Sequence, residues 1–120
     1  MNKYVKVIYI KLISLFIIMN YIHAMNQNNI ELNNINQAIL AQLESANSIQ
    51  LMTAIFKGKT YFDDNLNNYI DKEINKINRI KIIDDFNNKR ITKMKELVRF
   101  VALKLDNNNP TRALFFLLNP

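Results

Sequence analysis

The sequence predicts an all-α protein: a small antiparallel bundle of three main helices plus a short C-terminal helix, after an N-terminal signal segment. Two observations favour helices over strands. The 120 residues include one Gly and two Pro, which are too few for the many sharp turns of a sandwich or barrel. Apolar residues also recur every three or four positions, as on one face of a helix. The chain has no Cys, so apolar packing without disulfides must hold this fold together.

The start of the chain has the order of a secretory signal peptide. A basic region with three lysines and no acidic residue precedes a compact apolar core, LISLFIIM, which is followed by the small residue Ala24 and a polar stretch. This order is typical of a segment that is removed during export. We therefore predict a signal peptide over residues 1–24, cleavage between Ala24 and Met25, and export to the periplasm of a diderm bacterium. The lysines are Lys3, Lys6 and Lys11.

An alternative is that residues 4–25 stay in place as an uncleaved anchor, which would make the protein a small holin-like protein of the inner membrane. A spanning helix needs about 20 mostly apolar residues. Lys6 and Lys11 interrupt this stretch, and a lysine at the bilayer centre costs about 2.5–3.5 kcal/mol. Under both interpretations the basic end stays inside, and residues 25–120, a single α-helical domain, cross to the far side.

The first predicted helix of this domain spans residues 30–56. Asn28 or Asn29 is placed to cap its start. Gly58, the only glycine, lies just past its end, where we expect it to adopt the left-handed conformation that closes a helix. The apolar positions at helical spacing are Leu32, Ile35, Ile39, Leu43, Ala46, Ile49, Met52 and Phe56.

Two further long helices are predicted over residues 65–83 and 89–105. Asp63 or Asp64 is the expected N-cap of the earlier one. The later one has apolar residues in the three-four rhythm of a packed helix seam. The short connections predict that neighbouring helices are antiparallel. The seam residues are Ile91, Met94, Val98, Val101 and Leu105.

A short last helix is predicted over residues 110–118, with Asn109 as its N-cap and Pro110 in its first turn. It carries the apolar run ALFFLL. This run either closes the core of the bundle as a lid or forms an exposed strip for self-association, as a homodimer or higher oligomer, or for a membrane partner. The candidate strip residues are Leu114, Phe115, Leu117 and Leu118.

The residues that usually carry catalysis are scarce. His23 is the only His and lies in the predicted leader, and without Cys the usual nucleophile–base pairs and zinc sites lack their parts. The carboxylate pairs Asp63–Asp64 and Asp84–Asp85 lie at predicted helix starts. Asp is favoured there as a cap, so we interpret both pairs as caps and not as an acid pair or a calcium site. We therefore predict no enzyme, no cofactor and no metal site.

A basic cluster lies on the helix predicted over residues 89–105. It is either the solvated back of an amphipathic helix or a contact surface for anionic lipid headgroups or a protein. Nucleic acid is not expected as a partner, because three of the 16 basic residues belong to the predicted leader and because export would separate the protein from DNA. The candidate residues of this basic face are Lys89, Arg90, Lys93 and Arg99.

Three runs of the sequence resemble the prophage-encoded Bly-type holin accessory proteins. They are residues 30–39 (IELNNINQAI), 61–70 (YFDDNLNNYI) and 94–100 (MKELVRF), and the resemblance extends over most of residues 28–118. It implies a small helical protein that supports a membrane-permeabilising holin during host lysis, with a small membrane protein as its partner. It carries no catalytic residues across.

A further alternative belongs to a different class of function. An exported helical domain without catalytic residues is also compatible with a secreted surface or virulence protein that binds a host molecule. The three hypotheses differ in where the protein is found: with a membrane partner, in the membrane with Met1 intact, or outside the cell.

Overall fold

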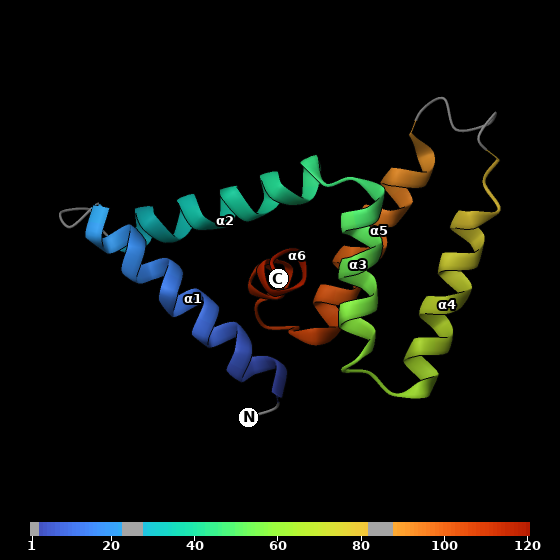
Figure 1. Ribbon diagram of the computed structural model, residues 1–120, viewed down its shortest axis with the longest axis horizontal. Helices are drawn as coiled ribbons and strands as arrows, with labels where there is room; N and C mark the ends of the chain where they lie inside the picture. Colours follow the sequence, from blue (N-terminus) through green and yellow to red (C-terminus); the bar gives the residue numbers. More distant parts are fainter. Residues whose placement is uncertain (1–2, 23–27, 82–87) are drawn as a thin grey trace.

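The computed structural model shows six helices and no strand in the part of the chain that it describes (Figure 1). The all-α prediction is therefore confirmed for that part. The described backbone covers residues 3–22, 28–81 and 88–120, and the described side chains belong to residues 3–15, 33–81 and 88–120. The helices are α1 (Lys3–Ile22), α2 (Asn28–Ser45), α3 (Ser48–Lys59), α4 (Asp64–Asn78), α5 (Lys89–Leu105) and α6 (Pro110–Leu118).

Three features of the sequence analysis lie outside the described residues. They are the cleavage position between Ala24 and Met25, the single histidine His23, and the carboxylate pair Asp84–Asp85.

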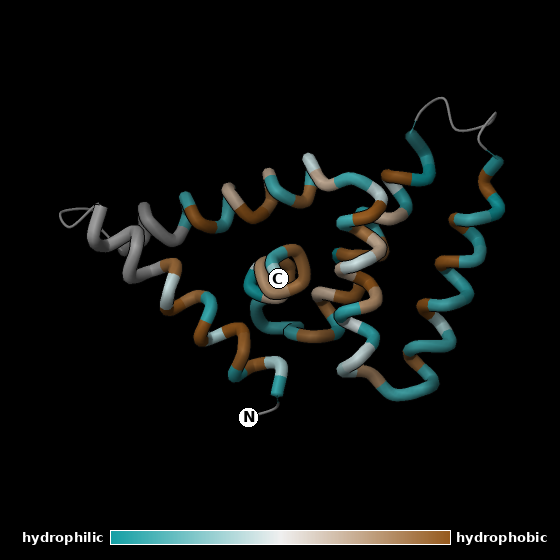
Figure 2. The backbone as a smooth tube through the Cα atoms, in the orientation of Figure 1, coloured by the Kyte–Doolittle hydropathy of each residue, from teal (hydrophilic) through white to brown (hydrophobic). Residues whose placement is uncertain are grey.

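Helix α6 lies at the centre of the molecule. It packs against α1, α2, α3 and α5, which surround it in the view of Figure 1. A helix that is apolar on all sides tends to be buried, and the colouring of Figure 2 shows hydrophobic residues around the turns of α6. Its buried side chains are Ala113, Leu114, Phe116 and Leu117. The arrangement is thus organised around the short last helix, which was expected either to close the core as a lid or to carry an exposed strip.

The predicted single helix over residues 30–56 is wrong, because the chain breaks between α2 and α3. Asn47 caps α3 in a capping box: its side chain accepts a hydrogen bond of 2.9 Å from the Gln50 backbone N–H, and the Gln50 side chain accepts one of 2.9 Å from the Asn47 N–H. Such reciprocal bonds satisfy N–H groups that have no partner inside the helix. The apolar spacing continues through Leu43 and Ala46, both buried, so periodicity alone did not reveal the break.

The predicted left-handed glycine is also wrong. Gly58 lies within α3, is buried and does not have a positive φ. An added Cβ would lie 2.2 Å from Cγ1 of Val101 on α5, which is far inside van der Waals contact. The glycine is required because α3 and α5 approach each other closely there, and not because the backbone turns.

Helix α4 lies at the edge of the molecule and packs against α5 (Figure 1). It ends at Asn78, short of the predicted boundary at residue 83, and its buried residues are Ile70, Ile74 and Ile77. Asp63 is its N-cap, as predicted, and accepts a hydrogen bond of 2.9 Å from the Leu66 N–H.

The bounds of α5 and α6 agree with the predicted ranges, residues 89–105 and 110–118. Asn109 caps α6 by accepting a hydrogen bond of 3.1 Å from the Arg112 N–H, and Pro110 occupies the first turn. The start of α6 was predictable because a cap and a proline mark it locally, whereas Asn88, which precedes α5, has a φ of 55° and makes no side-chain capping bond.

The first half of α1 packs against α6 as part of the core. Tyr4 and Ile8 are fully buried. The Tyr4 ring meets the rings of Phe116 and Tyr61 edge to face, with centroids 5.0 Å and 5.8 Å away, an arrangement that aromatic pairs prefer. Residues of the predicted leader therefore contribute to the core of the intact chain.

Within residues 3–22, 28–81 and 88–120, none of the helices combines the length and the apolar character that crossing a membrane requires.

Candidate interaction surfaces

An open apolar groove lies between α3 and α5. We call it the α3–α5 groove; it has a volume of about 530 Å³. Ile49 and Phe56 stand at its surface with 76% and 51% of their areas exposed. The lining residues are Ser48, Ile49, Met52, Thr53, Phe56, Arg90, Ile91 and Met94. None of these residues is acidic.

The groove exists because α3 has two apolar faces. One face, with Leu51, Ala54, Ile55 and Gly58, is buried. The other carries Ile49, Met52 and Phe56 at a spacing of three and four residues, so these side chains follow one line along the helix. Methionine side chains adapt their shape to a partner. An apolar helix of another protein could therefore lie along this line between α3 and α5.

The sequence analysis assigned Ile49, Met52 and Phe56 to the core stripe of a single long helix. The break at Asn47 separates them from that stripe: Ile49 and Phe56 are exposed, and Met52 is half-buried and packs against the core. The sequence does contain a signal for this outcome, because Asn47 and Gln50 have the spacing of a capping box.

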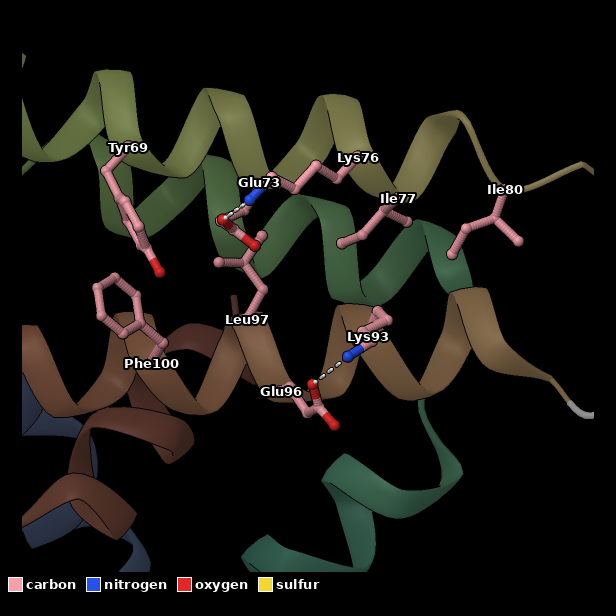
Figure 3. Close-up of a pocket in the computed structure, with 9 residues that line it drawn as sticks. All are labelled: Tyr69, Glu73, Lys76, Ile77, Ile80, Lys93, Glu96, Leu97 and Phe100. Atoms are coloured by element: carbon pink, nitrogen blue, oxygen red, sulfur yellow. Dashed lines mark hydrogen bonds and ion pairs between the residues drawn. The ribbon is translucent and has the colours of Figure 1, made fainter.

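A second cleft, of about 390 Å³, lies between α4 and α5 (Figure 3). At one end the rings of Tyr69 and Phe100 have centroids 5.1 Å apart. Ion pairs mark both rims: Lys76 Nζ lies 3.0 Å from Glu73 on α4, and Lys93 Nζ lies 3.5 Å from Glu96 on α5. The rims of this cleft therefore carry charges of both signs, whereas the α3–α5 groove has no acidic residue in its lining.

The structure divides the predicted basic face of α5 among different neighbours. Lys93 pairs with Glu96 at the α4–α5 cleft, whereas Arg99 Nη2 lies 2.6 Å from a carboxylate oxygen of Glu44 on α2. Arg90 lines the α3–α5 groove, and Lys89 is exposed beside it. Exposed ion pairs of this kind contribute about 0–1 kcal/mol each. The four cations therefore do not form one continuous patch.

The predicted apolar strip of α6 lies in the core. Leu114 and Leu117 are buried, and Phe115 and Leu118 are half-buried. The helices that surround α6 cover this strip, so a partner could reach Leu114 or Leu117 only if one of them moved away. The arrangement agrees with the core-closing interpretation of the run ALFFLL.

Three helices send polar side chains to the C-terminal end of α6. Lys57 Nζ donates hydrogen bonds of 2.7 Å and 2.9 Å to the carbonyls of Phe116 and Asn119. Lys11 of α1 donates one of 2.8 Å to the same Asn119 carbonyl, and the amides of Gln42 and Asn119 exchange two bonds of 3.2 Å and 3.1 Å. The last carbonyls of a helix lack partners within it and attract cations.

Crowding at this helix end changes the proton affinity of one amine. Burial, and then the positive charge of the neighbouring Lys11, lower the pKa of Lys57 to about 8. An amine with such a pKa can act as a nucleophile, but this one is engaged with two backbone carbonyls. Its position is explained by capping of α6.

Among the described side chains, no three His, Cys, Asp or Glu residues gather in a group that could hold a metal ion. Comparison of the chain with protein-family models, curated proteins and solved structures finds no match.

Proposed function

We propose that this chain is a non-enzymatic helical interaction protein: an exported prophage holin accessory protein that supports membrane permeabilisation during host lysis. The observation that carries the proposal is the α3–α5 groove, in which Ile49 and Phe56 remain largely exposed. The partner is a small holin-like membrane protein, one helix of which lies in the groove.

The energetics of the groove favour such a partner. Fully burying a side chain such as Ile49 or Phe56 contributes about 1.5–3 kcal/mol. In helix-in-groove recognition an amphipathic helix lays its apolar face into an apolar groove, and Ile49 and Phe56 would be covered by such a helix. The exposed Lys89, next in sequence to the lining residue Arg90, favours a partner helix with an acidic residue at the matching end.

Other parts of the proposal come from the sequence. The basic start and apolar core of residues 1–24 support export to the periplasm. The runs at residues 30–39, 61–70 and 94–100 support the holin accessory role through their resemblance to that family. Self-association is also proposed, through the same exposed apolar residues of α3.

A site-specific crosslinking experiment tests the proposal. A photo-activatable amino acid at Met52, inside the groove, should crosslink the full chain to a small membrane protein in cells undergoing lysis. The matched control carries the same amino acid at Leu103, an apolar residue of α5 that is 42% exposed and does not line the groove.

The double variant Ile49→Ser/Phe56→Ser should lose the crosslink from position 52 and delay host lysis. The variant Leu103→Ser should do neither. If both variants lyse the host at the normal time and position 52 crosslinks no membrane protein, the proposed function is wrong.

A further inference from the structure

Helix α1 presents two different faces over residues 3–15. Its inner face is locked onto α6: Tyr4 and Ile8 are fully buried, and Lys11 donates a hydrogen bond of 2.8 Å to the Asn119 carbonyl. These residues follow one another at spacings of four and three, so they lie on one side of the helix.

The outer face of α1 combines lysines with exposed isoleucines. Lys3 and Lys6 are exposed, and one turn further along Ile10 and Ile13 expose 66% and 55% of their areas. Tyr9 borders this face, 40% exposed, with the Arg112 guanidinium 4.7 Å from its ring centroid. The sequence of α1 contains no acidic residue.

We propose that this outer face is a docking surface for an anionic lipid bilayer, with α1 lying in the plane of the membrane surface. Lysines beside isoleucines and a tyrosine are the pattern of a helix that rests in the headgroup region. The absence of acid from α1 makes its face electrostatically complementary to anionic headgroups and less suited to a basic protein helix.

The fixed inner face explains why α1 lies on the membrane and does not enter it. Insertion of the whole helix would pull Tyr4 away from Phe116 and Tyr61, and would expose the centre of the core. Resting on the surface keeps these contacts and buries only Ile10 and Ile13, which are already exposed. This position requires that residues 1–24 stay on the chain after they have directed export, so it differs from both a removed leader and a spanning anchor. It goes beyond the proposed partner binding at α3.

Vesicle flotation of the purified full chain tests the inference. The chain should float with vesicles of phosphatidylglycerol and phosphatidylcholine, and binding should weaken with added salt and be far weaker with phosphatidylcholine alone. The variant Ile10→Ser/Ile13→Ser should lower the partition coefficient about tenfold or more. Lys3→Gln/Lys6→Gln should lower it about fivefold per lysine.

Matched controls use exposed residues on other helices. Leu40→Ser/Leu103→Ser removes two apolar residues that are 39% and 42% exposed, and Lys72→Gln/Lys81→Gln removes two exposed lysines; both should float like the wild type. Circular dichroism should give the same spectrum for every variant, since all these positions are at the surface.

Three results would overturn the inference. The first is unchanged flotation of Ile10→Ser/Ile13→Ser, and the second is equal binding to both kinds of vesicle. The third is an intact mass showing that the native protein begins at Met25, since it would then lack α1. The vesicles contain no protein, so this test is independent of the partner proposed for the α3–α5 groove: Ile49→Ser/Phe56→Ser should float normally even though it loses the crosslink.

Discussion

Lys57 lies over the ring of Phe116, with its Nζ 4.1 Å from the ring centroid, and the same Nζ donates a hydrogen bond of 2.7 Å to the Phe116 carbonyl. One amine thus contacts both the side chain and the backbone of the central helix. It joins α3 to the end of α6, to which Lys11 of α1 also binds. The helix most enclosed by others is therefore held at its C-terminal end by polar groups from its neighbours.

This relationship predicts how stability depends on pH. The pKa of Lys57 is about 8 in the folded chain and near 10.4 in an unfolded one. Between these values the unfolded chain binds more protons, so the free energy of unfolding should rise as the pH rises from about 8 toward 10. Urea denaturation at a series of pH values should show this rise in the wild type and a smaller one in Lys57→Met. A rise of equal size in both would contradict the assignment to Lys57.

Tyr4 predicts a change of the opposite sign at higher pH. Burial, and then the charge of Asp106, raise the pKa of the Tyr4 hydroxyl above its ordinary value near 10. Above that value the folded chain binds more protons than the unfolded one, so stability should fall. In Tyr4→Phe this loss of stability at high pH should be absent. Spectrophotometric titration of tyrosine ionisation, together with urea denaturation of the two proteins, would test this.

The same residue predicts contrasting effects of two substitutions. The Tyr4 hydroxyl is buried and has no hydrogen-bond partner among the described residues, so Tyr4→Phe should leave stability unchanged or raise it by up to about 1 kcal/mol. Tyr4→Ala should lower stability by about 3–5 kcal/mol, because it opens a cavity against Phe116. A small effect of Tyr4→Ala on urea denaturation would mean that α1 does not complete the core.

Gly58 predicts a steric coupling between α3 and α5. Alanine is favoured over glycine within a helix by about 1 kcal/mol, but a Cβ at this position would lie 2.2 Å from Val101, and overpacking of this kind costs about 1–3 kcal/mol. We expect Gly58→Ala to destabilise the protein, whereas Thr53→Ala, at an exposed position of the same helix, should change stability by less than about 0.5 kcal/mol.

A double-mutant cycle separates this clash from other effects. Combined with Val101→Ala, the Gly58→Ala substitution should cost less than it does alone, because the smaller side chain leaves room for the new methyl group. Additive effects of the two substitutions in urea denaturation would show that the two residues do not meet.

The capping box at Asn47 predicts how much the junction between α2 and α3 contributes to stability. Asn47→Ala removes the side-chain oxygen that accepts the hydrogen bond from the Gln50 N–H and should lower stability by about 0.5–2 kcal/mol, whereas the bond from the Asn47 backbone N–H to the Gln50 side chain does not need the side chain of residue 47. Asn47→Asp should retain most of the stability, since Asp caps equally well. Asn68→Ala, at an exposed position within α4, serves as the control. Equal losses for the alanine and aspartate variants at residue 47 would argue against capping.

Helix boundaries that a local signal marks were predictable from the sequence. Asp63 and Asn109 were expected as N-caps and serve as such, and the ranges of α5 and α6 agree with prediction. Prediction failed at Asn47, where the apolar rhythm continues through the break, and at Gly58, whose reason is a neighbour on another helix. Local chemistry sets the ends of helices, but a rhythm of apolar residues cannot reveal a change of direction.

The exposure of the candidate surface residues also could not be predicted from the sequence. Leu114 and Leu117 were candidates for an exposed strip and are buried, while Ile49 and Phe56 were assigned to the core and are largely exposed. All four are apolar residues at helical spacing, so the sequence makes them equally suitable for either role. Which of them is covered depends on how the helices are arranged around α6.

By itself, the sequence determined that the described chain is helical and where most of its helices begin. Only the tertiary structure decided that α6 is central, that Lys11 and Lys57 meet at its end, and that the groove beside Ile49 is open. The physical reason is the separation along the sequence over which each effect acts. Caps and helix propensities depend on a few neighbouring residues, whereas burial depends on contacts between residues far apart in the chain.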